Sequence, residues 1–463
     1  MGNKQPNKSN IKIAYIGGGS RGWAWALMKD LALAKNISGQ VALYDIDYEA
    51  AQHNEIIGNR IPEDHPQASR WEYKAEPTIE KALDGADFVV ISILPGTFRE
   101  MESDVHAPEK YGIYQSVGDT TGPGGVIRAL RTIPMFEEIG KAIRDVCPNA
   151  WVSNYTNPMT VCVRTLYRVF PGIKAFGCCH EVFSTQKLLC QVLEKIDGIQ
   201  GLDRHDIETN VFGVNHFTWI DRATYGKKDI LPLYREYIRR VRSGELEAHK
   251  DLGAQDLVFE SNELVKMDLF MRTGVIAAAG DRHLAEFVPL NWYMKDPEQV
   301  ASWGYGLTPV SWRWQNLQER MDRSKRLLER KEAFDLTLSG EDGVEQIRAI
   351  MGIGDMISNV NLPNMGQIPN LPLGAVVETN ALFTHDTVRP VMAGALPDSV
   401  YALVAPVVAE QEMIVEAALS RDLELAFEAF MRDSHMPLAV KDARCLFNTM
   451  IENTKEYLPG YKL

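Results

Sequence analysis

The chain has 463 residues, 45% of them hydrophobic, which is enough to bury a large core and to form two domains. A formal net charge of -13 argues against duplex nucleic acid as a partner, because phosphate contacts depend on Lys and Arg. The polar first ten residues lack the apolar segment of a secretory signal, and no apolar run is long enough to span a membrane. We therefore expect a cytoplasmic protein whose six cysteines are reduced.

The first elements predict a dinucleotide site. An apolar run from Ile11 leads into a glycine turn and a helical segment, and Gly17, Gly19 and Gly22 fit the pattern G-x-G-x-x-G. Asp45 then ends a second predicted strand. Glycines let backbone N–H groups approach a pyrophosphate, and an acid at this position accepts from a ribose hydroxyl, which favours NAD over NADP. The alternative is a structural corner without a ligand, but the order of strand, glycines, helix and acid favours the cofactor.

The next segments continue the alternation of strands and helices that is typical of a doubly wound sheet. Predicted helices cover 48–61, 78–83 and 126–146, and a buried strand covers 86–94. A glycine-rich loop, Gly118 to Gly125, precedes the third of these helices. Asp119 in this loop either forms a turn or supplies a catalytic carboxyl, and the residues alone favour the turn.

Three polar clusters follow apolar runs between Ala150 and Trp219. They contain Asn157, then Cys179 with His180, then His216. Open α/β sheets bind ligands beyond the carboxyl ends of their strands, so these clusters predict one site. A thiolate and two imidazoles suit Mn, Fe, Co, Ni or Zn, although a lone cysteine is more often a buried apolar residue. The residues alone leave metal binding and packing as equal alternatives.

The second half, from about residue 201, predicts a domain of helices with a few strands. Helices are expected over 229–246, 312–334 and 423–431, and a hairpin or sheet edge over 360–364 and 373–378. Asp281, Arg282 and His283 follow another apolar run. They form either a solvated turn or an edge that faces substrate, and both interpretations stand.

Together these motifs resemble glycoside hydrolase family 4, the glycosidases that depend on NAD and a divalent metal such as Mn²⁺. The matching residues are Gly17 to Ser20, Gly118-Asp119, Asn157-Pro158, Cys179-His180, Gly213 to His216 and Gly280-Asp281. The surrounding residues look most like the bacterial α-galacturonidase branch. The resemblance implies a Rossmann-like domain over 1–200, similar to lactate and malate dehydrogenases. An α+β domain over 201–463 would then serve substrate binding and oligomerisation.

The resemblance also implies a mechanism. NAD⁺ would take hydride from C-3 of the sugar, a base would remove the acidified C-2 proton, and the glycosidic oxygen would leave with acid assistance. Hydration and return of the hydride would complete the cycle without net redox change.

The residue roles that the resemblance implies fall into four sets. The cofactor would be held by Gly17, Gly19, Ser20, Gly22, Asp45 and Asn157. The metal would be bound by Cys179 and His216, with Cys178 packed in the core. Asp119 would be the acid and Asp281 the base. Asn157 and His180 would contact the sugar, and we hypothesise that Arg282 and His283 bind a uronate carboxylate.

Several alternatives stay open. Within the family these are an α-glucuronidase, an α-glucosidase or α-galactosidase, and a 6-phospho-glycosidase. The N-terminal half alone also fits an NAD-dependent dehydrogenase of a hydroxy acid or sugar, although hydride transfer of that kind needs no thiolate-bound metal. A nicotinamide sensor would have no use for two carboxyl groups in its site. The expected assembly is a homodimer or homotetramer.

Overall fold

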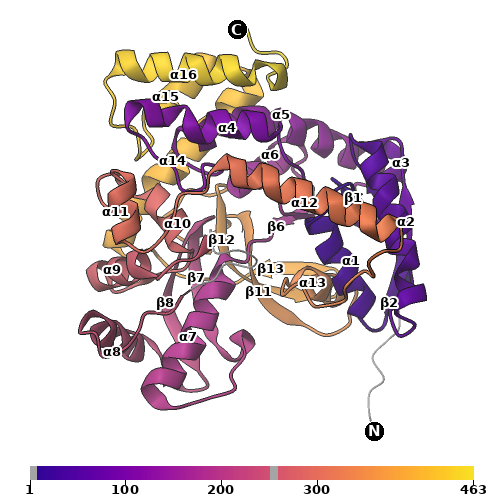
Figure 1. The fold of residues 1–463 in the computed structure, drawn as a ribbon, viewed down its shortest axis with the longest axis horizontal. Coiled ribbons are helices and arrows are strands. Elements are labelled where there is room, and N and C mark those ends of the chain that lie inside the picture. The colour runs from indigo at the N-terminus through magenta and orange to yellow at the C-terminus, as the bar shows by residue number, and fades with distance from the viewer. Residues whose placement is uncertain (1–7, 251–258, 463) are drawn as a thin grey trace.

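The computed structural model describes residues 8–250 and 259–462, so residues 1–7 of the predicted polar start lie outside the described residues. In the described part, nine strands form one sheet in the order β13-β12-β11-β6-β5-β4-β1-β2-β3 (Figure 1). Its first six strands are β1 (Lys8–Ile16), β2 (Ile37–Tyr44), β3 (Trp71–Ala75), β4 (Phe88–Ile91), β5 (Trp151–Asn154) and β6 (Lys174–Gly177). These six are parallel, and their order 3-2-1-4-5-6 is that of the Rossmann fold, which confirms the predicted fold class.

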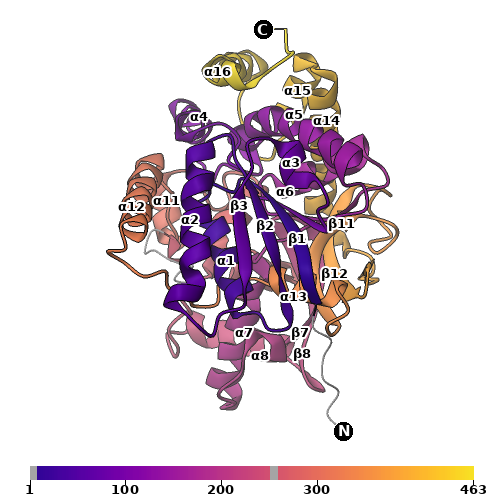
Figure 2. The same cartoon turned by 90° about the vertical axis from the view of Figure 1, so that its right-hand side faces the viewer.

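The parallel strands are buried because helices cover the sheet, as Figure 2 shows for α2 beside β3, β2 and β1. All four residues of β4 are buried, as expected for a strand with both faces covered. The helices of this half are α1 (Trp23–Leu33), α2 (Tyr48–Asp64), α3 (Ile79–Leu83), α4 (Phe98–His106), α5 (Gly122–Val146), α6 (Met159–Val169) and α7 (Glu181–Asp197).

Helix α5 begins four residues earlier than the sequence predicts, inside the glycine-rich loop. A residue far along the chain, Asp433, contacts this early start of the helix. Asp433 accepts hydrogen bonds from the Gly122 backbone N–H, at 2.7 Å, and from the Thr121 hydroxyl, at 3.0 Å. This carboxylate and Gln115, whose Oε1 accepts from the Gly124 N–H at 2.9 Å, supply side-chain acceptors for the N-terminus of α5.

A hairpin from the second half extends the first sheet. Strands β11 (Met356–Pro363), β12 (Val376–Thr384) and β13 (Thr387–Pro390) are antiparallel, and Asn361 of β11 pairs with Gly177 of β6. The hairpin or sheet edge predicted over 360–364 and 373–378 is confirmed, and it is a hairpin. The sheet therefore contains strands from both sides of the domain boundary that was predicted near residue 200.

A second, smaller sheet lies beside α7. It consists of β7 (Glu208–Val214), β8 (Phe217–Tyr225), β9 (Lys228–Asp229) and β10 (Ile276–Ala277). Asn215 and His216 form the two-residue turn between β7 and β8. The helices that follow are α8 (Leu231–Arg242), α9 (Leu264–Thr273), α10 (Asp281–Leu284) and α11 (Pro297–Ser302). Helix α8 is shorter than predicted and ends before Gly244, whose φ of +76° interrupts a helix.

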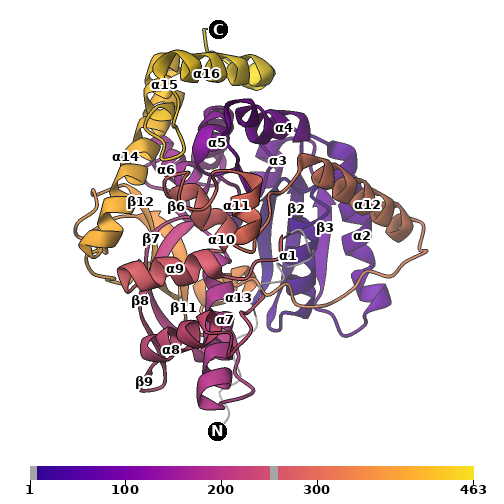
Figure 3. The ribbon, with the colours of Figure 1, turned by 60° about the vertical axis from the view of Figure 1, so that its left-hand side comes forward.

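The remaining helices connect the layers. Helix α12 (Val310–Leu328) crosses one side of the Rossmann half (Figure 1), and it ends before Arg330, whose φ is +57°, instead of continuing to residue 334. Helix α13 (Gly343–Ile350) packs beside α1. Helices α14 (Asp398–Ser420), α15 (Leu423–Phe430) and α16 (Val440–Thr454) gather near α4 and α5 (Figure 3). Among the helices of the described residues, none is both long and apolar enough to cross a bilayer.

Candidate active site

The glycine loop between β1 and α1 has the backbone that the fingerprint predicts. Gly17 has a φ of +96°, and a Cβ there would lie 2.0 Å from the Ser92 carbonyl oxygen, so this position excludes a side chain. The Gly19 N–H donates to the carboxylate of Asp45 at 2.8 Å. Asp45 therefore anchors the loop, and burial raises its pKa.

The start of α1, where a pyrophosphate binds in this fold, has Gly22 as its N-cap and no side-chain capping bond. The hydroxyl of Ser20 accepts from the N–H groups of Gly22, at 3.4 Å, and Trp23, at 3.2 Å. A Cβ at Gly22 would lie 2.1 Å from the guanidinium of Arg320, so α12 closes over this loop. The local geometry fits a dinucleotide, with α12 as an additional wall that the sequence did not predict.

Asp119 lies where the glycine-rich loop meets the end of β5. Its carboxylate accepts from the Asn157 side chain at 3.1 Å and from the Thr120 hydroxyl at 2.7 Å. The Thr120 oxygen is also 3.1 Å from Nδ1 of His216. The structure thus brings together Asp119, Asn157 and His216, which lie in three separate sequence motifs.

Side chains that could bind a metal ion cluster around Asp119 and His216. In the described part of the chain, one group of three metal-binding residues has its donor atoms within 4.8 Å of one another: Asp119, His216 and His283. The two imidazole rings are 3.9 Å apart between centroids. Burial, then the neighbouring His283, lowers the pKa of His216 to about 3, so its ring is neutral at pH 7. A carboxylate with two neutral imidazoles suits a divalent transition metal.

Cys179 is buried and is not one of the three members of this cluster. Burial, followed by the charges of Glu378 and Glu181, raises the pKa of its thiol well above the usual value. Ligation would therefore need the cation itself to remove the proton. Cys178, in contrast, packs in the apolar core, where its thiol bonds to Gln346 at 3.2 Å.

Glu181 joins the histidines to the loop before α10. Its carboxylate accepts from the Gly280 N–H at 2.8 Å and lies 3.7 Å from Nε2 of His283. Burial raises its pKa, but the nearby His283 and His180 outweigh burial and keep the pKa below the ordinary value. The ionised Glu181 thus contacts both the Gly280 backbone before α10 and the His283 side chain within α10, which keeps His283 in the cluster.

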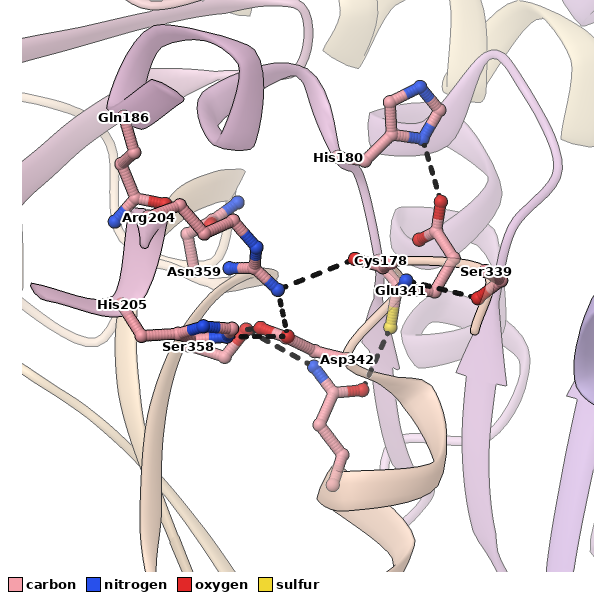
Figure 4. Close-up of polar contacts among 12 residues, drawn as sticks. Cys178, His180, Gln186, Arg204, His205, Ser339, Glu341, Asp342, Ser358 and Asn359 are labelled. Atoms are coloured by element: carbon pink, nitrogen blue, oxygen red, sulfur yellow. Dashed lines mark hydrogen bonds and ion pairs between the residues drawn. The ribbon is translucent and has the colours of Figure 1, made fainter. Parts of the chain in front are cut away.

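His180 begins α7 and faces the segment before α13 (Figure 4). Its Nδ1 lies 3.1 Å from the carboxylate of Glu341, and its ring centroid is 6.0 Å from that of Trp23. Trp23 begins α1 directly after the glycine loop. His180 therefore lies beside the start of α1, on the proposed cofactor side of the site.

Three arginines surround Asp119. Arg282 donates to the carbonyls of Ser116, at 2.7 Å, and Gly306, at 3.2 Å, and stacks over the ring of Phe259. Arg128 bonds to the Asn157 carbonyl at 3.2 Å, and its buried Nη1 has no hydrogen-bond partner among the described residues. Arg313 on α12 is a half-buried cation whose electrostatic partner is Asp119.

Asp281 is placed differently from the other predicted residues. Its carboxylate is fully buried and accepts from the backbone N–H groups of Val265, at 3.1 Å, and Lys266, at 2.9 Å, at the start of α9. Burial raises its pKa. In this geometry both oxygens stabilise the N-terminus of α9, and the role of base stays a prediction.

The sequence did not single out several side chains that shape the site. They are Thr120, Arg128, Glu181, Glu286 and Arg313. Glu181 and Glu286 follow His180 and Asp281 in motifs already noted, so a search for buried acids near those motifs would have found them. The arginines lie inside helices without a local signal, and only the fold brings them to Asp119.

Comparison with known proteins identifies the family. The family model described as "Family 4 glycosyl hydrolase" matches residues 12–195, and that of its C-terminal domain matches residues 211–436. The chain is 59% identical to an α-galacturonidase of Thermoanaerobacterium saccharolyticum over 98% of each chain. It is 51% identical to an α-galacturonidase of Bacillus subtilis, over 96% of this chain and 97% of that one.

Solved structures agree with this assignment. A crystal structure of a Bacillus subtilis protein assigned as a glucosidase superposes with a TM-score of 0.90 at 50% identity, covering 96% of this chain and all of that one. A 6-phospho-α-glucosidase from gut microorganisms, in complex with NAD and Mn²⁺, shares the fold with a TM-score of 0.79 at 21% identity, over 98% and 100% of the two chains. On these matches the chain belongs to family 4 of the glycosyl hydrolases.

Proposed function

We propose that this glycosyl hydrolase is an α-galacturonidase that works through NAD and a divalent cation such as Mn²⁺. The relatives at 51% and 59% identity, which match over nearly the whole chain, support the substrate class. Solved members of the fold that hold NAD and Mn²⁺ support the cofactors. The observation that carries the proposal is the meeting of Asp119, Asn157 and His216, because it joins the glycine-loop half to the imidazole cluster.

The proposed division of roles follows the geometry. The glycine loop with Ser20 and Asp45 would hold NAD, and His216 with Cys179 would hold the cation. Together these groups would supply a hydride acceptor at C-3 of the sugar and a Lewis acid that stabilises negative charge at its C-2 and C-3 oxygens. His283 stands 3.9 Å from His216 between ring centroids and can add to the same donor set.

Proton transfer falls to the carboxyl groups. Asp119 is proposed to protonate the leaving oxygen, and the Asn157 bond fixes the direction of its carboxylate. Burial raises the pKa of Asp119, but His216, Arg128 and His283 together keep it below the usual range. Asp119 is therefore ionised in the free protein, and it would take up a proton from solvent before donating it to the leaving oxygen.

A uronate carboxylate needs a cation near the sugar. We keep Arg282 and His283 as the proposed contacts, with His180 and Asn157 on other sugar hydroxyls. Two hydrogen-bonding positions of Arg282 are already used by the carbonyls of Ser116 and Gly306, which fix the plane of its guanidinium. A preset plane of this kind lowers the entropic cost of binding a carboxylate.

The test is an omission assay. An aryl α-galacturonide, the matching α-galactoside and the β-anomers would be incubated with NAD⁺, Mn²⁺ and a thiol reductant, each left out in turn. We expect hydrolysis of the α-galacturonide alone, and only in the complete mixture. Activity that survives removal of both nicotinamide and metal would contradict the mechanism. Net accumulation of NADH with a sugar or hydroxy acid would support a dehydrogenase instead. The homodimer or homotetramer stays a prediction.

A further inference from the structure

Glu378 is a buried carboxylate near Cys179 that has no role in the proposed reaction. Glu378 on β12 is 1% exposed and accepts three side-chain amide bonds. Its Oε1 accepts from Asn359 at 2.7 Å, and its Oε2 accepts from Asn215 at 3.0 Å and from Asn361 at 3.1 Å. Burial raises the pKa of Glu378, while the three amide donors favour its ionised form and fix the orientation of the groups around it.

Two of these amides continue to Cys179. Asn359 donates both to Glu378 and to the Cys179 backbone carbonyl, at 3.3 Å. The Asn215 side chain bonds to Glu378 and lies near enough to the Cys179 thiol to lower its pKa, and Asn215 directly precedes His216 in the β7–β8 turn. Because a carboxylate only accepts, both amides must turn their nitrogen toward Glu378, which leaves no freedom to flip.

We infer that Glu378 is a positioning residue that orients Cys179 and His216 for the cation through Asn359 and Asn215. The inference rests on the proposed function, since it assumes that these two residues hold the metal. It also gives a reason for the shared sheet: the hairpin β11–β12 carries Glu378, Asn359 and Asn361 from the second half to the end of β6. Residues that orient metal ligands typically change metal affinity by about 10- to 100-fold when they are replaced.

Glu378→Gln is the direct probe. A glutamine keeps the shape but replaces one acceptor by a donor, so at least one of the three amides has to turn away. The full-length protein would be titrated with Co²⁺ alone, and the absorption band of a thiolate–Co²⁺ bond would report Cys179. We expect Co²⁺ affinity to fall by at least about tenfold and the band to weaken, while NAD⁺ affinity and melting temperature stay near wild type.

The control is Glu76→Gln, which replaces another buried glutamate, one that pairs with Lys74 on β3, far from the cysteine along the sheet. This variant should bind Co²⁺ like wild type. A Glu378→Gln protein with wild-type affinity and band would overturn the inference, and so would an equal loss in the control. If the wild-type protein itself shows no thiolate–Co²⁺ band, Cys179 is not a metal ligand. That result would contradict the proposed function, whereas the comparison of variants tests the positioning role of Glu378.

Should Glu378→Gln not fold, Asn359→Leu decides the question. It removes the donor to the Cys179 carbonyl and leaves the other two amides on Glu378. A folded Asn359→Leu protein with weakened Co²⁺ binding and normal NAD⁺ binding supports the positioning role. Unchanged Co²⁺ binding contradicts it.

Discussion

The Asn157 side chain donates to the carboxylate of Asp119 across 3.1 Å, although the two residues are 38 positions apart. Asn157 follows β5, and Asp119 lies in the loop before α5. Arg128 reaches the carbonyl of the same asparagine from within α5. This contact joins the cofactor-binding half to the imidazole cluster, and the proposed chemistry depends on it.

The adjacent cysteines should respond in opposite ways. Cys179→Ala is expected to abolish activity and Co²⁺–thiolate absorption, because it removes a proposed ligand. Cys178→Ala should keep both and lose roughly 1 kcal/mol of stability, because its thiol packs in the core against Gln346. Steady-state kinetics and thermal unfolding of both variants measure this. Activity that is lost in the Cys178 variant and kept in the Cys179 variant would reverse the assignment.

Arginine variants test how the uronate is recognised. Arg282→Ala should raise KM for an aryl α-galacturonide by about tenfold or more and so weaken the preference for the galacturonide over the matching galactoside, since the proposed ionic contact to the carboxylate is lost. Arg313→Gln on α12 is the matched variant. Its side chain faces Asp119 but does not brace the Ser116 carbonyl. Discrimination that disappears only in the Arg313 variant would move the carboxylate contact to α12.

Asp281→Asn separates catalysis from folding. Loss of the charged acceptor at the start of α9 is expected to cost about 1–2 kcal/mol of stability. If Asp281 is the base, exchange of the C-2 proton should also fall by at least about 100-fold. We expect both effects, measured by chemical denaturation and by proton exchange. A less stable variant that exchanges at the wild-type rate would leave Asp281 a structural role only.

Stability should depend on pH through Glu286. Burial raises its pKa from the ordinary value of 4.5 to about 8, while its Oε1 accepts from the Val117 and Gly118 N–H groups. The folded state therefore holds a proton that the unfolded state releases, so this stabilisation is complete below about pH 4.5 and is lost as pH rises toward 8.

Glu286→Gln keeps the accepting oxygen and removes the titration. Denaturation at pH 5 and pH 8.5 should show a smaller loss of stability in this variant than in wild type. An equal loss in both proteins would show that Glu286 does not titrate in this range.

Local sequence patterns were sufficient for the glycine loop and the first two strands of the Rossmann half. The apolar run, the three glycines and Asp45 all lie within one strand-turn-helix-strand unit, so their spacing alone determines their geometry. The same holds for Asn157 and Cys179, which follow strand ends as expected.

Long-range contacts were beyond those patterns. Nothing near Asp119 indicates its bonds to Asn157 and Thr120 or its place beside His216, so the residues alone favoured a turn. The pairing of Asn361 with Gly177 joins segments that no periodicity connects. For Asp281 the residues alone left a solvated turn and a substrate-facing edge open, and no local pattern indicated the bonds that its carboxylate accepts at the start of α9.

The most direct test of the account is hydrolysis of an aryl α-galacturonide in D₂O with NAD⁺ and Mn²⁺, followed by NMR of the released sugar. Removal of the C-2 proton and its replacement from solvent predicts deuterium at C-2 of the product in each turnover. Product that keeps its original hydrogen at C-2 would contradict the redox elimination mechanism.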